Sequence, residues 1–319
     1  MVIDVHAHYM PKAHLTKYKS LFDLRETDKA WELYVNGRWI DLERGLFDLS
    51  AQVGDMERTG INQRLLSSYA QCFYYEKEEA VAWNKSYNDG VIQDIAPYND
   101  KFLFLATLPM CSIKEACQEL ERVMAMPPVV GVQIATNIAG KELDDAELED
   151  FWALAARLNA FILLHPAYVV STPRFKQYHL GNIIGNPLDT TIAAFRLMVG
   201  GVLDRHPSLS ICLSHTGGYL PFAMSRFDHG RRVRAELAHL SNKPSELAKK
   251  LYYDTIIHDA ACLEFAIERL GADRFLLGSD YPFDMSDPES VRTVNDISLS
   301  EGERLGILSF NVQRIIKKI

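Results

Sequence analysis

Short apolar runs alternate with longer amphipathic stretches along most of the chain, and this alternation constrains the fold more than any other feature. Eight runs are nearly continuous in apolar residues, which is typical of parallel strands covered on both faces. They are Val2–Val5, Gln63–Ser68, Phe102–Thr107, Val130–Ala135, Phe161–His165, Leu209–Ser214, Leu251–Thr255 and Phe275–Ser279. Helical patterns cover Leu49–Arg58, Lys77–Ile95, Ile113–Met124, Asp145–Leu158, Asp189–Asp204, Pro221–Leu240, Ala260–Leu270 and Leu299–Ile316. Eight successive strand–helix units predict an α/β fold, a (β/α)8 barrel of the TIM type.

The alternative for such a pattern is an open, doubly wound sheet. That fold normally carries a glycine-rich phosphate loop after its first strand, whereas the first run here is followed by His8-Tyr9-Met10-Pro11. One barrel also suits the length of 319 residues, because α/β barrels commonly reach this size as a single domain. We therefore expect residues 1–319 to form a single barrel domain.

One segment near the N-terminus does not fit the alternation. Residues 9–47 carry Trp31, Tyr34, Trp39 and Leu46 among many charges. We expect an insertion after the first strand that acts as a lid over the barrel or as a dimer arm. A second irregular stretch, Tyr168–Pro187, follows the fifth strand. Both would lie at the carboxyl ends of the strands, where barrel active sites form.

Charge and cysteine content exclude several classes of protein. The formal net charge is −8, so the chain lacks the positive surface that nucleic-acid binding requires. No run of 18 apolar residues is present, which argues against a membrane-spanning helix, and the first residues do not resemble a signal peptide. The five cysteines are scattered and include no CxxC pair. We therefore expect a cytoplasmic protein with reduced thiols.

Histidine and aspartate recur where the predicted strands end. His6 and His8 are two residues apart, and residues with this spacing point the same way in a strand. His165, His215 and Asp280 end the fifth, sixth and eighth predicted strands. Any one of them alone could be a buried structural residue or a helix cap. Together they predict a site for one divalent ion, since Zn²⁺ binds such nitrogen and oxygen ligands.

Four short motifs surround these residues: His6-Ala7-His8, Leu164-His165-Pro166, Ser214-His215-Thr216-Gly217-Gly218 and Gly278-Ser279-Asp280-Tyr281-Pro282-Phe283. In these motifs the chain resembles the amidohydrolase superfamily. Within it, the chain is similar to the branch of α-amino-β-carboxymuconate-ε-semialdehyde decarboxylase and related nonoxidative decarboxylases. The likeness extends over nearly the whole sequence.

The resemblance implies a role for each residue of the site. His6, His8 and His165 would bind the metal, with Asp280 as a ligand or close partner. His215 would be a general acid and base beside a water molecule that the metal makes acidic, and Asp280 would share in the proton transfer. The ion would be Zn²⁺, with Mn²⁺ as the alternative, and the family implies a homodimer.

Departures from the relatives limit what the resemblance implies. Binuclear members carry a carboxylated lysine at the end of the fourth strand, where this chain has Gln133, so a single metal is implied. The semialdehyde decarboxylase has a substrate-binding arginine where this chain has Gln52, which cannot form a charged bidentate clamp. Its second substrate arginine, which crosses a dimer interface, corresponds to Arg234. Tyr74 and Tyr168 follow strands and could contact substrate, or simply pack.

The sequence thus predicts a metal-dependent lyase that removes CO₂, without oxidation, from a small unsaturated or aromatic carboxylic acid. Losing one arginine clamp favours a substrate with one fewer carboxylate, or a phenolic acid. Two alternatives stay open. Hydrolysis or hydration of a carbonyl or unsaturated acid would use the same site, and a noncatalytic, metal-stabilised binding protein would use only its ligands.

Overall fold

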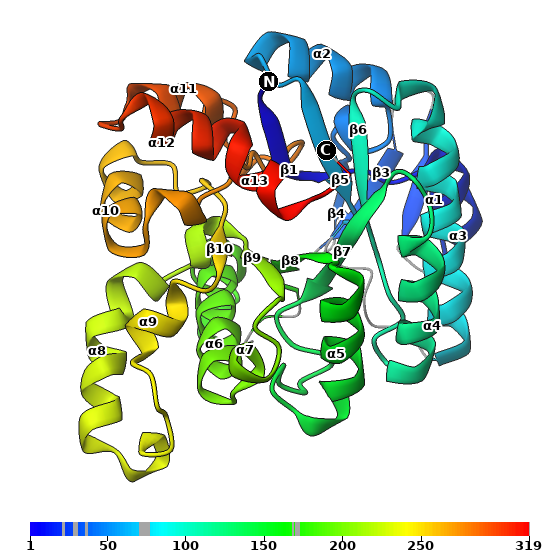
Figure 1. The fold of residues 1–319 in the computed structure, drawn as a ribbon. Coiled ribbons are helices and arrows are strands. Elements are labelled where there is room, and N and C mark those ends of the chain that lie inside the picture. Colours follow the sequence, from blue (N-terminus) through cyan, green and yellow to red (C-terminus); the bar gives the residue numbers. More distant parts are fainter. Residues whose placement is uncertain are drawn as a thin grey trace.

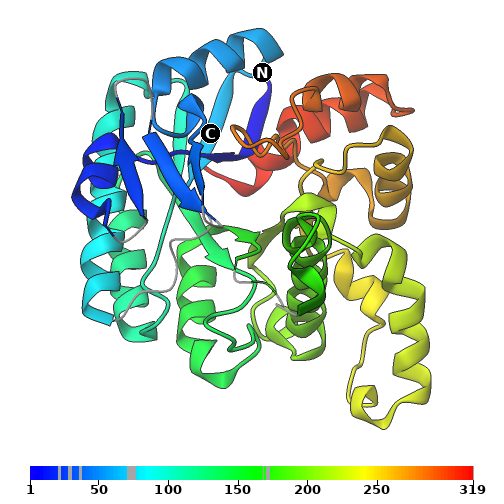
Figure 2. The ribbon, with the colours of Figure 1, turned by 180° about the vertical axis from the view of Figure 1, so that it is seen from behind.

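The computed structural model describes residues 1–20, 23–27, 31–35, 38–69, 77–167, 169 and 173–318. Seven parallel strands form one curved sheet in the order β1-β5-β6-β7-β8-β9-β10, and helices surround its outer side (Figures 1 and 2). The strands are β1 (Ile3–His8), β5 (Gln63–Ser67), β6 (Phe102–Ala106), β7 (Val129–Ala135), β8 (Phe161–His165), β9 (Ser210–Leu213) and β10 (Tyr252–Tyr253). The α/β barrel predicted from the alternation is confirmed.

The eighth predicted strand closes the barrel without becoming a regular strand. Residues 275–277 hydrogen-bond to Tyr253 on one side and to Val5 on the other, each at 2.9 Å. Further along, a Cβ at Gly278 would lie 2.8 Å from the nearest side-chain atom, so only glycine fits. Asp280 has a φ of 59°, and this left-handed backbone interrupts the ladder, which continues only as a single bridge between Ala7 and Tyr281. The prediction is right about the position of this segment and wrong about its regularity.

Local signals fix where several helices begin and end. Asp48 accepts a hydrogen bond from Ser50 N ahead of α2, and Gly60, with a φ of 77°, follows that helix. Asp259 caps α10 by accepting from Cys262 N. The helices are α1 (Lys12–Tyr18), α2 (Leu49–Thr59), α3 (Lys77–Ile95), α4 (Ile113–Met124), α5 (Glu149–Leu158), α6 (Asn186–Val199), α7 (Val202–Arg205), α8 (Leu220–Val233), α9 (Pro244–Ala248), α10 (Ala260–Leu270), α11 (Ser290–Asp296), α12 (Glu301–Leu305) and α13 (Asn311–Ile315).

Four predicted helices are shorter or interrupted. The helix expected over Asp145–Leu158 starts with a 3₁₀ turn over Ala146–Leu148 and is α-helical only from Glu149. The helix expected over Asp189–Asp204 is divided between α6 and α7, because Gly201 has a φ of 76°. The helix expected over Pro221–Leu240 ends at Val233, where Arg234 turns extended. The last predicted helix becomes α12 and α13 with a π-helical turn over Gly306–Phe310 between them. Helical spacing alone does not reveal such backbone changes.

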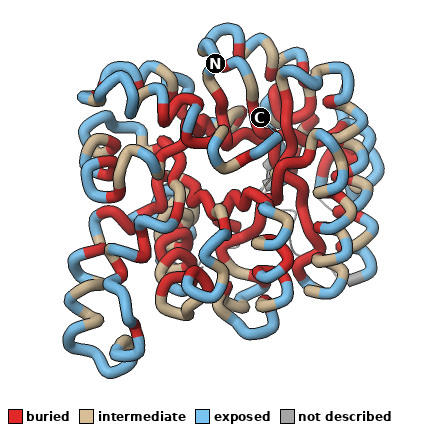
Figure 3. The backbone as a smooth tube through the Cα atoms, in the orientation of Figure 1, coloured by how far each residue is buried: buried red, intermediate tan, exposed pale blue. Residues whose placement is uncertain are grey.

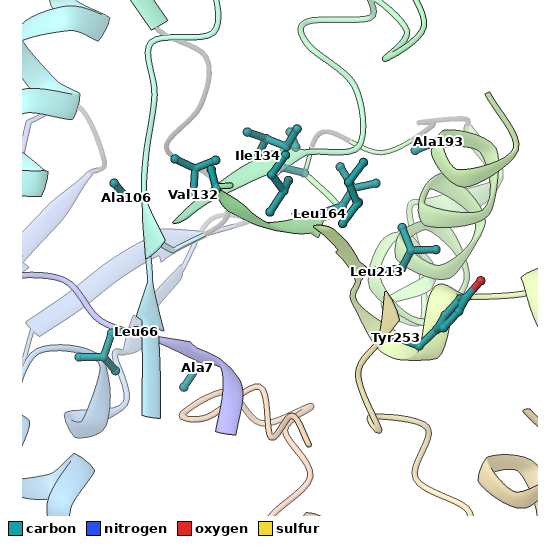
Figure 4. Packing of buried hydrophobic residues seen from close by; sticks show 14 of the residues in the cluster. Ala7, Leu66, Ala106, Val132, Ile134, Leu164, Ala193, Leu213 and Tyr253 are labelled. Atoms are coloured by element: carbon teal, nitrogen blue, oxygen red, sulfur yellow. The ribbon is translucent and has the colours of Figure 1, made fainter. Parts of the chain in front are cut away.

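Apolar side chains fill both sides of the sheet. The outer set packs the strands against the helices, as Figure 4 illustrates with Leu66, Val132 and Leu164. The inner set consists of Ile3, Val5, Leu65, Leu103, Leu105, Val130, Phe161, Leu163, Cys212 and Leu276, together with Val312 and Ile316 from the C-terminal segment. Buried residues therefore follow the barrel strands, while exposed ones cover the outer helices (Figure 3).

The insertion after β1 forms a layer of its own. Beyond α1, the strands β2 (Leu24–Glu26), β3 (Trp31–Val35) and β4 (Arg38–Asp41) make an antiparallel sheet, which lies on the face of the barrel that Figure 2 turns toward the reader. Trp31 and Leu33 are buried, whereas Tyr34 and Trp39 are exposed. Among the described segments, no helix combines the length and apolar character that crossing a bilayer requires.

Candidate metal centre

An irregularity in β1 turns two histidines toward the barrel interior. Between Asp4 and Ala7 the pairing shifts, so that β1 advances three residues where β5 advances two. Val5 belongs to the inner core, and strict alternation would then direct His6 outward. The extra residue changes the alternation. As a result, His6 and His8 both face the interior above the apolar core.

Five side chains from four places in the barrel converge at its carboxyl end. The Nε2 atom of His8 lies 3.2 Å from Nε2 of His6 and 2.9 Å from Oδ1 of Asp280. Oδ1 of Asp280 is also 3.3 Å from Nε2 of His6, and its Oδ2 is 3.4 Å from Nε2 of His215. One potential ligand atom from each of His6, His165, His215 and Asp280 lies within 4.8 Å of the others. The structure therefore brings together all five residues singled out from the sequence.

The ring contacts of three histidines leave the same nitrogen available for a metal. Nδ1 of His6 contacts Asp254 Oδ2 at 2.7 Å, Nδ1 of His8 contacts Ser68 O at 2.7 Å, and Nδ1 of His165 contacts Pro166 O at 3.1 Å. Each Nδ1 meets an acceptor, so in the neutral form of each ring Nε2 carries the lone pair that a metal ligand needs.

A buried atom without a partner supports the same conclusion. His165 is only 5% exposed, yet its Nε2 has no hydrogen-bond partner among the described residues. A buried polar atom of this kind is costly unless something binds it. Three imidazole nitrogens and a carboxylate oxygen are ligands that divalent metals such as Zn²⁺ accept. His6, His165, His215 and Asp280 therefore form a divalent metal site.

The electrostatics of the cluster favour a cation. Burial lowers the pKa of His6, but the Asp280 charge and the hydrogen bond to Asp254 outweigh it and raise the pKa to about 10. Burial, reinforced by repulsion from His6, holds the pKa of His165 well below its ordinary value, and burial also lowers that of His8. Although burial opposes ionisation, the His6 charge and hydrogen bonds from the imidazoles keep the pKa of Asp280 well below its usual range. At neutral pH the metal-free cluster thus holds an ionised Asp280 and a protonated His6 beside the neutral imidazoles of His8 and His165.

Asp254, which follows β10 and is completely buried, was not predicted from the sequence. It contacts His6 and also accepts from the backbone N atoms of His215 and Thr216, at 2.9 and 2.7 Å. The available signal was a carboxylate directly after Tyr252 and Tyr253, at the C-terminal end of an otherwise apolar strand.

The predicted substrate residues lie in different places. Gln52 is fully buried, its Nε2 donates to His8 O and Gly45 O, and its Oε1 accepts from Arg64. These contacts indicate that Gln52 supports β1, and its contact with substrate stays a prediction. Arg234 is exposed and pairs with Glu236 at 2.8 Å. Tyr74 and Tyr168 lie outside the described residues.

A cavity of about 950 Å³ opens above the cluster and reaches His165, His215 and Asp280. The insertion forms one wall with Leu33, Asp41, Leu42, Glu43 and Leu46, and the stretch after β8 contributes Val169, His179, Gly181, Asn182 and Asn186. Tyr69, Phe283 and Met285 add further apolar surface. Both irregular stretches of the sequence thus border the site, as expected.

Comparison with known proteins gives a consistent picture. The sequence profile of a family described as amidohydrolase matches residues 3–316. The 2-amino-3-carboxymuconate-6-semialdehyde decarboxylase of Dictyostelium discoideum is 28% identical, over 95% of this chain and 88% of its own length. The gamma-resorcylate decarboxylase of Rhizobium sp. (strain MTP-10005) is also 28% identical, over 88% of this chain and 90% of its own.

Solved structures agree with the fold. The apo form of Metarhizium anisopliae IDCase superposes with a TM-score of 0.90 at 22% identity, covering 100% of this chain and 97% of that one. A dihydroxybenzoic acid decarboxylase from Polaromonas sp. JS666, solved with manganese and the inhibitor 2-nitroresorcinol, gives a TM-score of 0.82 at 25% identity. The match covers 99% of this chain and 96% of that one.

Proposed function

Because this chain belongs to the amidohydrolase family, we propose that it is a metal-dependent, nonoxidative decarboxylase of a small aromatic or unsaturated carboxylic acid. The observation that carries the proposal is the convergence of His6, His165, His215 and Asp280 beneath a cavity that the last three residues line. The relatives from Dictyostelium discoideum and Rhizobium are both decarboxylases, and they match most of the chain.

The residues of the site suggest how the reaction proceeds. A bound divalent ion would supply positive charge that holds carboxylate or phenolate oxygens of the substrate at the cavity floor. His215 borders the cavity and protonates the substrate carbon that bears the carboxylate. The bond from this carbon to the carboxylate then breaks, its electron pair restores the double bond or aromatic ring, and CO₂ leaves. Asp280, 3.4 Å from Nε2 of His215, stabilises the charged imidazole before the proton is transferred.

The proposal specifies one ion per chain. Gln133 stands where a carboxylated lysine would be needed to bridge two metals, and a neutral amide cannot replace that anionic bridge. Imidazole nitrogens with one carboxylate favour Zn²⁺. Mn²⁺ is the alternative, supported by the manganese in the Polaromonas enzyme.

The cavity favours an acid with a single carboxylate. No lysine or arginine is found among its described lining residues, whereas Asp41, Glu43 and Asp284 are. A second carboxylate would therefore meet like charge unless another subunit contributed a cation. In the homodimer that we propose, Arg234 would fill this role in the partner's cavity. It is exposed, and its side chain pairs with Glu236.

Two further features complete the proposal. Residues 1–319 act as one barrel domain, with residues 9–47 as its lid, since the insertion provides one wall of the cavity. We place the enzyme in the cytoplasm. Cys117, Cys212 and Cys262 are free thiols, which suits a reducing compartment.

Release of CO₂ tests this function directly. Metal-loaded protein is incubated with a panel of hydroxybenzoic and dienoic acids, and CO₂ is measured together with loss of the acid. We expect turnover of at least one phenolic or unsaturated acid, and its loss in His215→Asn. Cleavage of lactones or amides without CO₂ release from any acid would instead establish a hydrolase on the same site.

A further inference from the structure

Asp254 is a buried carboxylate with an unusually complete set of donors. Its Oδ2 contacts His6 Nδ1 at 2.7 Å and accepts from His215 N at 2.9 Å. Its Oδ1 accepts from Thr216 N at 2.7 Å and from Ile256 N at 3.2 Å. A carboxylate removed from water is tolerated only when its oxygens are satisfied in this way. Asp254 therefore joins three segments of the barrel: β1, the turn after β9, and its own strand end.

The first of these contacts sets the chemistry of His6. Because Nδ1 donates to Asp254, Nε2 carries the lone pair when the ring is neutral, and this is the atom 3.2 Å from His8 Nε2. His8 and His165 use neutral backbone carbonyls for the same purpose. Among the described residues of the cluster, His6 is the only imidazole whose Nδ1 contacts a carboxylate. A carboxylate makes the ring a stronger ligand than a carbonyl does.

The other contacts hold the turn that carries His215. His215 and Thr216 both have a φ of 54°, a left-handed conformation that costs residues other than glycine about 1 kcal/mol or more. Both backbone N atoms donate to Asp254, so the carboxylate stabilises this conformation. The turn in turn places Nε2 of His215 3.4 Å from Asp280.

We propose that Asp254 is a positioning residue that fixes the metal ligand His6 and the general acid His215 at the same time. The inference rests on the proposed metal-dependent function, but it concerns metal binding and geometry, which can be measured without substrate. We also expect that one substitution of Asp254 affects both the metal affinity at His6 and the position of His215, which would otherwise be independent.

The test is Asp254→Asn, which keeps the size of the side chain and replaces one acceptor oxygen by a donor. If the new NH₂ faces His6, the ring must accept there, and Nε2 then carries a proton and cannot bind metal. If it faces the turn, the N–H groups of His215 or Thr216 lose their acceptor. We expect the dissociation constant for Zn²⁺, measured by competition with a chelator, to rise about 10- to 100-fold. The visible spectrum of the Co²⁺-loaded protein should change as well.

Asp287→Asn is the matched control, because Asp287 is also buried but its carboxylate accepts from Glu289 N and not from a residue of the cluster. It should retain wild-type Zn²⁺ affinity and Co²⁺ spectrum. Wild-type values for both in Asp254→Asn would overturn the proposal, whatever the activity assay shows. If Asp254→Asn does not fold, Asp254→Glu decides in the same way. It keeps the charge but moves it by one methylene, and an unchanged affinity and spectrum would again refute the proposal.

Discussion

The two ends of the barrel interior are built from the same strands and have opposite physical properties. At the amino-terminal end, β8 contributes Phe161 and Leu163 to a continuous apolar core. At the carboxyl end, the same strand presents His165, whose Nε2 has no partner among the described residues. Other polar atoms at this end are also buried without a hydrogen-bond partner in the part of the chain that is described: Thr107 Oγ1, both amide atoms of Gln133, and Ser214 Oγ.

This contrast separates stability from function along single strands. Apolar burial contributes roughly 25 cal/mol per Å², so the amino-terminal end of the barrel interior stabilises the fold. Each polar atom buried without a partner costs about 1–3 kcal/mol, so the carboxyl end destabilises it. An arrangement of this kind persists when the polar half has a use. Substitutions at the two ends should therefore have different consequences.

Removing His165 should produce the largest loss of function. His165→Ala deletes a metal ligand, and because a catalytic metal contributes several kcal/mol to the transition state, activity should fall by about 10³-fold or more. Metal content per chain, measured by atomic emission, should fall with it. The free energy of unfolding of the metal-free protein should change little, since the deleted group is polar and borders the cavity. Retention of both metal and activity would remove His165 from the site.

His215→Asn separates the two roles that the site offers this residue. If His215 is the general acid, turnover should fall about 10²- to 10⁴-fold while metal content stays at the wild-type level. His215 also lies within the tight group of potential ligands. Loss of metal together with activity would make it a ligand, and unchanged turnover would exclude both roles.

Leu163→Ala tests the other end of the same strand. Leu163 is fully buried two residues before His165, and truncating such a side chain costs about 2–5 kcal/mol of stability. Urea unfolding should show this loss, while metal affinity and turnover of the folded protein stay near wild-type values. A parallel loss of metal affinity would mean that the two ends are not independent.

The raised pKa of His6 makes metal binding depend on pH. In the metal-free protein His6 keeps its proton up to about pH 10, whereas a metal ligand must be neutral. His8 and His165, with lowered pKa values, are already neutral at pH 7. Between pH 7 and 9 the metal dissociation constant should therefore fall about tenfold per pH unit. Calorimetry in buffers of different ionisation enthalpy should detect about one proton released per metal, and a constant affinity over this range would contradict the assignment.

The same protonation has an opposite effect on the metal-free fold. Because the pKa of His6 is raised above its ordinary value of 6.5, its contribution to stability is complete below pH 6.5 and is lost as the pH rises toward 10. Thermal unfolding of the metal-free protein should therefore show a decrease in stability over the pH range in which metal affinity increases.

Much of the barrel could be predicted because burial on both faces leaves a direct trace in the sequence. The run Phe161–His165 is observed as β8 with the same bounds, since apolar residues fill it up to the ligand. The residues of the cluster could also be predicted, because residues such as His165 and Asp280 end otherwise apolar runs. Strand ends meet at one rim in a parallel barrel, so the positions of these residues predict that they lie close together but do not give the distances between them.

The features that the sequence did not predict depend on backbone detail and on contacts with residues that are distant in sequence. No pattern in Ile3–His8 announces the extra residue that brings both histidines inward, since it exists only relative to β5. Gln52 and Asp254 look like ordinary helix and strand residues. Their roles come from His8 O and His6 Nδ1, respectively 44 and 248 positions away.

Gln133→Leu should have the smallest effect, and it tests most directly how much stability is lost by burying polar atoms at the carboxyl end. Gln133 is fully buried, and neither amide atom has a partner among the described residues. An apolar residue of similar volume removes this desolvation, so the free energy of unfolding of the metal-free protein should rise by about 1 kcal/mol. Gln52→Leu is the matched control. The same replacement there removes the amide that donates to His8 O and Gly45 O and accepts from Arg64 Nη1, and it should destabilise the protein. Opposite signs for two buried glutamines would show that the polar end is maintained against stability, whereas a loss in both would mean that Gln133 is satisfied by bound water.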